Sequence, residues 1–388
     1  ATGQKMRESV GLNECIERVD KDMRAGDFLW SWREGHRHFA WGLAIGYKNT
    51  GLGGGAPDKS SAQVEVWAQP DNGTGIAVRA EVRTSSAEMG QGLPAVLAAC
   101  TAEELGIPID RVNVLLGDTD YCPDGGPTTA SRQTFVSGNA ARHAARAVVQ
   151  QLAPLAAGIL QCEIADIRFT DSEFRAGDKS VGLGEVIMRA TESAIPTEAE
   201  YEYWAPKTQP LGTGGDMHFA FGFCAQAVLC EINARSGEVH VRKVIAAHDV
   251  GRAINPLTLE GQIEGGIVMC IGYALSEHFI QEQGMPWTSV MARYKMPGIK
   301  HTPKIISHIV EHQTSTGPYG AKGVGELPSI PTSAAITNAI YRATGVRVRS
   351  LPVDQDELLR AMRSGAKEVE LGWGNLEPIP MVTLGGEK

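Results

Sequence analysis

A glutamate between glycines is the residue of this sequence best suited to acid–base chemistry. Glu326 stands in the run GAKGVGELP, residues 320–328, and Leu327 and Pro328 follow it directly. A carboxylate on a short, rigid loop with few polar neighbours is a suitable general base. The alternative is that Glu326 begins a helix and balances the positive end of its dipole. Lys322, in the same run, is either a donor to a phosphate or cofactor, or a solvated surface charge.

Two glycine-rich turns could bind an anionic ligand through the backbone. EMGQG at 88–92 and PDGGPTTASRQT at 123–134 each precede residues with helical spacing. Because N–H groups at the start of a helix favour phosphate, two such turns predict a large anionic ligand. The second turn adds side-chain donors, of which the Arg132 guanidinium suits a phosphate: Ser131, Arg132, Gln133 and Thr134. Neither turn matches a P-loop or dinucleotide fingerprint, and the alternative is that the glycines only permit tight turns.

The sequence has no ligand spacing typical of a metal held by side chains. Its seven cysteines are odd in number and scattered, which predicts reduced and mostly structural thiols. Its ten histidines do not cluster either. Any metal must therefore be carried by another group.

Hydrophobic periodicity predicts the elements that position these turns. Apolar residues at helical spacing indicate a helix within 9–24, a helix over 93–106 and a longer one after residue 134. Alternating patterns predict a hairpin turned at 70–73 and a second strand pair, 219–232 with 238–247. Two further helices are expected, one from about Leu257 and one with Ile336, Ile340 and Ala343 on one face. The predicted fold class is α+β.

A stretch rich in Pro, Gly and Thr, residues 206–216, indicates a boundary between two units. We expect a first subdomain over 1–205 with the EMGQG and TTASRQT loops, and a second over 206–366 with the GVGE loop. Residues 367–388 are expected to form a loosely structured or partner-docking tail.

Composition excludes several classes of protein. The 388 residues are 43% hydrophobic and 21% charged, which is enough to bury a large core and excludes disorder as the main state. The net charge of -9 argues against a nucleic-acid partner. No stretch approaches the ~18 consecutive apolar residues of a membrane span, so no membrane association is expected. The start of the chain lacks the pattern of a signal peptide, and a cytoplasmic location is expected.

The order and wording of the motifs resemble the molybdenum-binding subunit of the xanthine dehydrogenase and aldehyde oxidase family. The resemblance covers nearly the whole chain. It is carried by Gly46-Tyr47, the run 53–57, EMGQG at 88–92, PDGGPTTASRQT at 123–134, HDVGRAINP at 248–256, EGGIVMCIG at 264–272, GPYGAKGVGE at 317–326 and AAITNAIYRATGVRV at 334–348. It implies two mixed sheet-and-helix subdomains of a molybdenum cofactor-binding domain.

The family's cofactor is a molybdopterin whose dithiolene sulfurs hold molybdenum, which agrees with the missing ligand cluster. The resemblance implies that Glu326 is the general base in the oxidation of an N-heterocycle or an aldehyde, with oxygen from water. The SRQT wording favours the cytosine dinucleotide form of the cofactor. The cofactor-binding positions implied by the resemblance are Met89, Gly90, Gln91, Ala130, Ser131, Arg132, Gln133, Thr134, Met269, Lys322 and Gly323.

Two departures from the family pattern stand out. Met269 occupies a position where many relatives have a glutamine, in a motif like EGAFVQG, so an amide contact toward the cofactor is lost. The family's subunit is also about twice as long, and this chain resembles its second half. Another polypeptide is then expected to supply the other half of the small-molecule pocket, and partner subunits the 2Fe-2S and FAD groups. Two alternatives are a non-catalytic cofactor-handling or assembly protein and a carbon monoxide dehydrogenase-type subunit.

Overall fold

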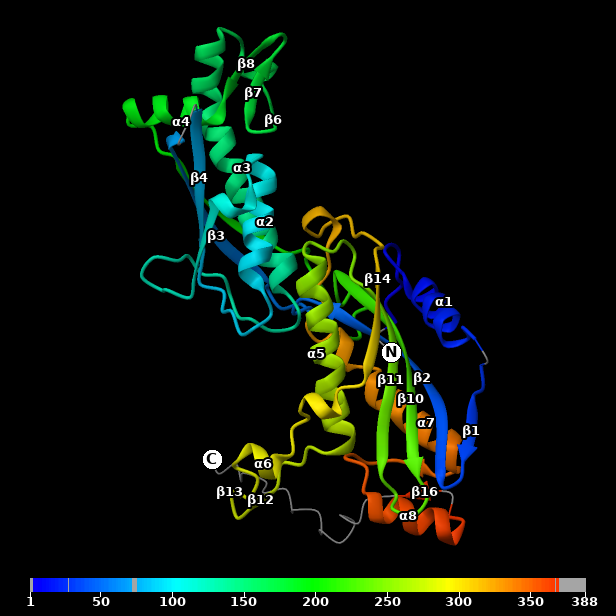
Figure 1. Ribbon diagram of the computed structural model, residues 1–388. Coiled ribbons are helices and arrows are strands. Elements are labelled where there is room, and N and C mark those ends of the chain that lie inside the picture. The colour runs from blue at the N-terminus through cyan, green and yellow to red at the C-terminus, as the bar shows by residue number, and fades with distance from the viewer. Residues whose placement is uncertain (1–2, 27, 72–74, 367, 370–388) are drawn as a thin grey trace.

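The computed structural model describes residues 3–26, 28–71, 75–366 and 368–369. Two sheets, each covered by helices, lie toward opposite ends of an elongated molecule (Figure 1). The helices are α1 Leu12–Met23, α2 Leu93–Leu105, α3 Gln133–Leu160, α4 Leu183–Glu192, α5 Pro256–Leu275, α6 Met291–Tyr294, α7 Thr332–Thr344 and α8 Gln355–Ser364. The longer strands are β2 Arg37–Thr50, β3 Lys59–Asp71, β4 Gly75–Thr84, β5 Val112–Leu116, β9 Glu198–Trp204, β10 Ala220–Asn233, β11 Val239–Asp249 and β14 Lys304–Val310. The shorter strands are β1 Ser31–Glu34, β6 Arg168–Thr170, β7 Glu173–Ala176, β8 Lys179–Gly182, β12 Gln281–Glu282, β13 Met285–Pro286, β15 Arg347–Val348 and β16 Glu368–Val369.

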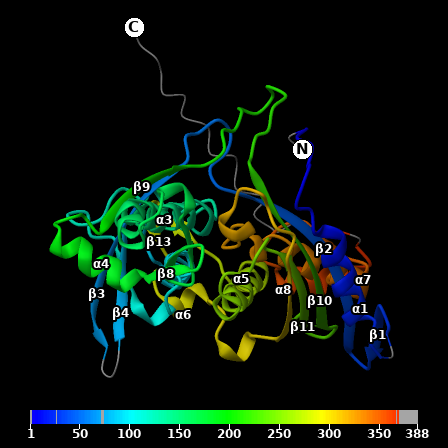
Figure 2. The same cartoon turned by 90° about the horizontal axis from the view of Figure 1, so that it is seen from above.

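A five-stranded sheet of order β1-β2-β10-β11-β14 forms one end of the molecule. β10 pairs antiparallel with both β2 and β11, and β14 runs parallel to β11. Apolar side chains on both faces of β10 and β11 are buried, so both faces need a covering layer. α1 covers one face, and α5 and α7 cover the other (Figure 2).

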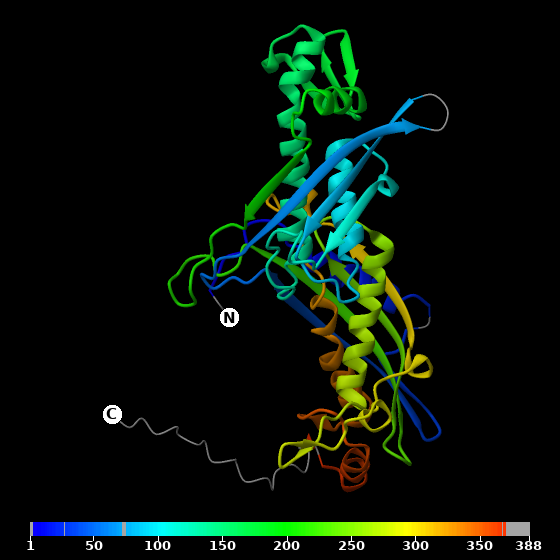
Figure 3. The ribbon, with the colours of Figure 1, turned by 90° about the vertical axis from the view of Figure 1, so that its left-hand side faces the viewer.

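A four-stranded sheet of order β5-β4-β3-β9 forms the other end. Its core joins alternate residues of β3 and β4 to apolar residues of α2, α3 and α4. The long α3 runs beneath this sheet toward a small sheet of β6, β7 and β8 (Figure 3). The first turns of α2 and α3 both lie at the end nearest the five-stranded sheet, which brings the two glycine-rich turns together.

The mixed α and β fold class is confirmed, but the domain boundary predicted at 205/206 does not follow the sheets. Residues 12–50 were assigned to the first subdomain, yet α1, β1 and β2 pack into the five-stranded sheet. The reason is non-local pairing, since β2 pairs with β10 along its whole length. Of the predicted tail at 367–388, only residues 368–369, which form β16, belong to the described residues. Residues 72–74 of the predicted hairpin turn lie outside the described residues.

None of the described helices is long and apolar enough to cross a membrane. Among the same residues, no three His, Cys, Asp or Glu side chains come together as a set that could hold a metal ion.

Candidate functional site

Three loops and one helix enclose a hollow of about 520 Å³ between the two sheets. The loop before α2, the turn that leads into α3 and the loop after β14 all line it, and the last two are in direct contact. Gln262 of α5 closes one side. The lining residues are Met89, Gly90, Gln91, Thr128, Thr129, Ala130, Ser131, Arg132, Gln133, Thr134, Gln262, Gly323, Val324, Gly325 and Glu326. The structure thus brings together three sequence motifs that are far apart in the chain.

The walls of the hollow interlock through their backbones. Ala130 and Ser131 both have positive φ, at 49° and 52°, which turns the Ser131 carbonyl toward the opposite loop. A Cβ on Gly323 would lie 1.7 Å from that carbonyl oxygen, so glycine is required where the two loops meet. The Gly51 amide donates to the Ala130 carbonyl at 2.9 Å and fixes the first loop to the end of β2.

The five-stranded sheet forms the floor under the 323–330 loop. Because side chains alternate along a strand, Lys48 and Thr50 of β2 lie on the same face. The Thr50 hydroxyl accepts from the Gly323 amide at 3.0 Å. On β10, a Cβ at Gly222 would lie 2.8 Å from the Leu327 side chain, so the missing side chain makes room for the loop.

Glu326 reaches the hollow with two polar partners. The Ser131 hydroxyl donates to its Oε2 at 2.7 Å and accepts from its backbone amide at 3.1 Å. The Lys48 ammonium lies 3.0 Å from the same Oε2, and the carboxylate side chain is 50% exposed. The expectation of a carboxylate without polar neighbours is therefore wrong. Glu326 does precede a helical turn, but this turn is the three-residue 3-10 segment Leu327–Ser329, too short for a substantial dipole.

The Arg132 side chain does not face the hollow as a phosphate donor, which corrects that prediction. The guanidinium is 1% exposed and forms an ion pair with Asp58 at 2.7 Å. Its other N–H groups donate to the backbone carbonyls of Gly125, Pro127 and Lys59. Arg132 thus holds the 125–132 loop against β3, a structural role. Gln133 is similarly engaged, since its side-chain amide donates to the Pro127 carbonyl and the Thr128 hydroxyl.

Lys322 does not line this hollow but a small hollow that adjoins it, and its ammonium is bonded within the protein, so it is not a free donor to a cofactor. Its ammonium pairs with Asp249 at 2.7 Å, and both side chains are fully buried. It also donates to the Ser9 carbonyl at 2.8 Å. Burial lowers the pKa of Lys322, and the Asp249 carboxylate opposes that change. The same carboxylate accepts from the Gly11 and Gly251 amides, so the pair anchors the base of the loop.

The EMGQG loop lines the hollow at Met89, Gly90 and Gln91, but several of its amides are already engaged. The Glu88 carboxylate accepts from the amides of Gly90 and Leu93 at 2.6 Å. The Gln91 side chain accepts from the Met89 amide at 2.6 Å. The prediction that these N–H groups point outward toward an anion is thus wrong for this loop. The N-terminal turn of α3, with Gln133 and Thr134, lines the hollow as the remaining helix start.

Of two residues on α5, Gln262 lines the hollow and Met269 does not. Gln262 lines the hollow and its side-chain amide donates to the Gly90 carbonyl at 3.3 Å. Met269, predicted as a cofactor-binding position, lies two turns further along, about 10 Å by the helix rise. It is 56% exposed and does not line this hollow. Sequence reasoning missed Gln262 and Lys48. The available signal for Gln262 was a polar residue beside the apolar face of a helix. The available signal for Lys48 was a lysine two residues before Thr50 on a strand.

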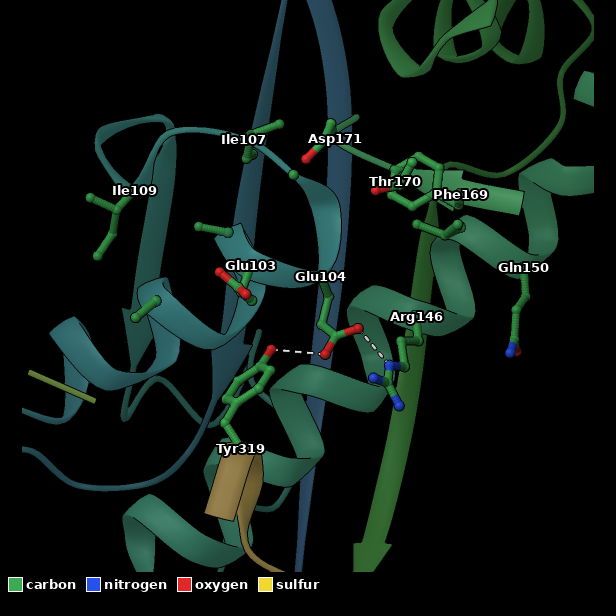
Figure 4. A pocket seen from close by; sticks show the side chains of 14 residues that line it. Glu103, Glu104, Ile107, Ile109, Arg146, Gln150, Phe169, Thr170, Asp171 and Tyr319 are labelled. Atoms are coloured by element: carbon green, nitrogen blue, oxygen red, sulfur yellow. Dashed lines mark hydrogen bonds and ion pairs between the residues drawn. The ribbon is translucent and has the colours of Figure 1, made fainter. Parts of the chain in front are cut away.

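A second hollow, of about 890 Å³, lies at the other end of α2 (Figure 4). Its central carboxylate, Glu104, is fully engaged by Arg142, Arg146 and the Tyr319 hydroxyl. These contacts neutralise its charge within the protein. The hollow of about 520 Å³, where the Glu326 side chain is 50% exposed, is therefore the better candidate for an active site.

Comparison with known proteins identifies the class of protein. The molybdopterin cofactor-binding domain family matches residues 17–303. The chain belongs to that family, and its relatives are molybdenum-binding subunits of the xanthine dehydrogenase and aldehyde oxidoreductase type.

Two curated relatives illustrate the similarity. The gamma subunit of the 6-hydroxypseudooxynicotine dehydrogenase complex of Paenarthrobacter nicotinovorans is 33% identical over 73% of this chain and 36% of its own length. The aldehyde oxidoreductase molybdenum-binding subunit PaoC of Escherichia coli K12 is 30% identical over 84% of this chain and 41% of its own length. The chain therefore spans well under half of these relatives.

Solved structures share the fold. The aldehyde oxidoreductase of Desulfovibrio desulfuricans ATCC 27774 matches 90% of this chain and 34% of its own, with 28% identity and a TM-score of 0.69. Quinoline 2-oxidoreductase of Pseudomonas putida 86 matches 93% of this chain and 46% of its own, with a TM-score of 0.75. At 23% identity the latter likeness concerns the fold alone.

Proposed function

We propose that the hollow between the sheets binds a molybdopterin cofactor and that Glu326 is the general base of a molybdenum hydroxylase. The observation that carries the proposal is a half-exposed carboxylate on a glycine loop, facing a hollow in a chain of this family. The substrate class is an N-heterocycle or an aldehyde, which is oxidised with oxygen from water.

The residues of the hollow fit such a group. Its volume of about 520 Å³ is within the usual range for small-molecule and cofactor sites, roughly 300–1,000 Å³. Gly325 is exposed and has no side chain, so a flat ligand can approach its backbone closely, whereas Gly323 is buried against Ser131. The N-terminus of α3, at Gln133 and Thr134, favours an anionic group. A metal held by the cofactor's own sulfurs needs no protein ligand, in keeping with a wall made of backbone, amide and hydroxyl groups.

The phosphate-binding role needs a different arginine from the one predicted. Arg252 lines a small hollow that adjoins the main one and shares Gln91, Thr134 and Gln262 with it. Its side chain is exposed, whereas the Arg132 guanidinium is buried among protein acceptors. We assign to Arg252 and the start of α3 the contact with the phosphate or dinucleotide part of the cofactor, in the cytosine dinucleotide form.

In this account the bound cofactor supplies the metal centre that takes up the substrate's electrons. The task of the chain is to orient the cofactor and to accept a proton. Glu326 is placed for the second task because its carboxylate faces the hollow from a loop fixed at Gly323 and Ser131. Gln91 and Gln262 also line the hollow, where their side-chain amides bond to the 87–90 backbone and so shape the EMGQG loop.

The activity of the whole enzyme requires further polypeptide. Relatives of this chain are named as subunits of complexes, and the chain spans well under half of their length. We propose that the remaining part of the substrate pocket and the iron–sulfur and flavin groups that remove electrons are supplied by partner polypeptides.

Replacing the base tests the assignment. Glu326→Gln keeps the size and hydrogen-bonding geometry of the side chain but cannot accept the proton. We expect molybdenum and pterin contents near those of the unmodified assembly, with substrate hydroxylation reduced by about 10²–10⁴-fold. The matched control combines Glu326→Gln with Gln262→Glu, which places a carboxylate elsewhere in the hollow. This double variant should not regain turnover. Unimpaired turnover by Glu326→Gln, with normal cofactor content, would show that the base lies elsewhere.

A further inference from the structure

Lys48 is a charged residue that pairs with Glu326 and lies outside the sequence motifs described above. It lies near the end of β2, with its side chain 19% exposed, and its ammonium is 3.0 Å from Glu326 Oε2. It also donates to the Asn49 carbonyl oxygen at 3.1 Å and to the Asn49 side-chain oxygen at 3.2 Å. Two anchors thus fix the ammonium beside the carboxylate.

The contacts of Glu326 are unequal between its two oxygens. Lys48 and the Ser131 hydroxyl both approach Oε2, from two different structural elements. Among the residues that the structure describes, no donor approaches Oε1. One oxygen is therefore held and the other remains available at the hollow.

The position of Lys48 is set by the sheet and not by a flexible loop. Lys48 stands opposite Gly222 of β10, where the absence of a side chain admits Leu327. Thr50, on the same face of β2, accepts from the Gly323 amide. The same two strands therefore position both the loop that carries Glu326 and the cation that pairs with it.

We propose that Lys48 is a positioning residue for Glu326: its ammonium holds Oε2 and directs Oε1 into the hollow. This inference rests on the proposed role of Glu326 as the base. Ser131 shares the task by fixing the carboxylate from the turn that leads into α3.

The first test needs neither cofactor nor turnover. The purified chain is treated with trace acetic anhydride, and the acetylation rate of each lysine is measured by mass spectrometry. An ammonium that is held against a carboxylate is less accessible to the reagent, so Lys48 should react several-fold faster in Glu326→Gln. Lys59, which pairs with Glu202 at 2.6 Å on the other sheet, is the internal reference and should not change. Equal Lys48 rates in the two proteins would overturn the pairing.

The second test uses the assembled enzyme. Lys48→Met keeps most of the side-chain length without the charge, and Lys48→Arg keeps the charge. We expect Lys48→Met to lower kcat by about 10–100-fold with normal molybdenum content and little change in KM, and Lys48→Arg to restore most of the rate. Lys59→Met is the matched control and should retain full activity.

The outcomes separate the two proposals. Full activity of Lys48→Met, or equal losses in Lys48→Met and Lys48→Arg, would overturn the positioning role while the role of Glu326 stands. Full activity of Glu326→Gln would overturn the role of Glu326 and, with it, any catalytic consequence of the pair.

Discussion

The charged residues under the loops and those at the hollow have different surroundings, although Arg132, Lys322 and Glu326 all belong to glycine-rich motifs. Arg132 and Lys322 are buried, and each is surrounded by a carboxylate and backbone carbonyls. Glu326 is half exposed and has one oxygen held by Lys48 and Ser131. A charge whose partners are all internal stabilises the loop, whereas a charge with a free face can react.

Buried and partly exposed ion pairs also differ in how much their loss affects folding stability. A buried ion pair gives little net stability, but removing one partner leaves an uncompensated charge and costs several kcal/mol. A partly exposed pair such as Lys48 with Glu326 contributes less to folding, because solvent screens it. The buried pairs should therefore control stability, and the exposed residues should control cofactor binding and turnover.

Replacing each of two arginines in turn gives the largest expected effect on stability. Arg132→Met leaves Asp58 unpaired in the core and should lower the free energy of unfolding by about 3–5 kcal/mol, measured by denaturant titration with circular dichroism. Arg252→Met, the matched surface change, should leave the unfolding midpoint unchanged but reduce pterin retention. If Arg132→Met were as stable as the unmodified chain and lost only pterin, the division between buried and exposed charges would be incorrect.

Two glycines of one loop give a smaller contrast. A Cβ on Gly323 would lie 1.7 Å from the Ser131 carbonyl oxygen, whereas a Cβ on Gly325 meets the Ser131 hydroxyl at 3.8 Å. Gly323→Ala should therefore cost about 1–3 kcal/mol of unfolding free energy, and Gly325→Ala much less. Denaturant midpoints of the two variants measure the difference. Equal midpoints would mean that the loops do not interlock at Gly323.

The buried side of the comparison should also respond to pH. Burial lowers the pKa of His248 to about 3, with Gln226 3.4 Å from its ring. The unfolded chain binds a proton near the usual pKa of about 6.5, so stability is lost as pH falls below that value. His248→Gln should reduce this loss by up to about 1.4 kcal/mol per pH unit, seen in unfolding titrations between pH 6.5 and 5. A pH dependence identical to that of the unmodified chain would contradict a neutral, buried His248.

The elements with strong local patterns could be predicted from the sequence. The spacing of Leu93, Leu97 and Cys100 predicts α2, and the alternation in β3 and β4 predicts their pairing. The resemblance to a family predicted which three loops belong to the site. The structure places Met89, Gln91, Ser131, Thr134, Gly323 and Glu326 around one hollow, while their contacts with a cofactor remain a prediction.

The remaining features depend on pairings between distant parts of the chain. The motif containing Arg132 suggests a phosphate donor until Asp58, on another element, is placed beside it. Lys322 is buried for the same reason, because β11 ends at Asp249 beneath the loop. Neither periodicity nor motif spacing contains this information. Lys48 was missed because its partner lies near the other end of the sequence.

The central claim is that this hollow holds a molybdopterin through backbone, amide and hydroxyl groups. The most direct measurement is the molybdenum content of the native assembly containing this chain, by elemental mass spectrometry, together with mass spectrometry of the pterin released from it. We expect about one molybdenum per chain and a pterin carrying a cytosine nucleotide. An intact native assembly that contains neither molybdenum nor pterin would contradict it.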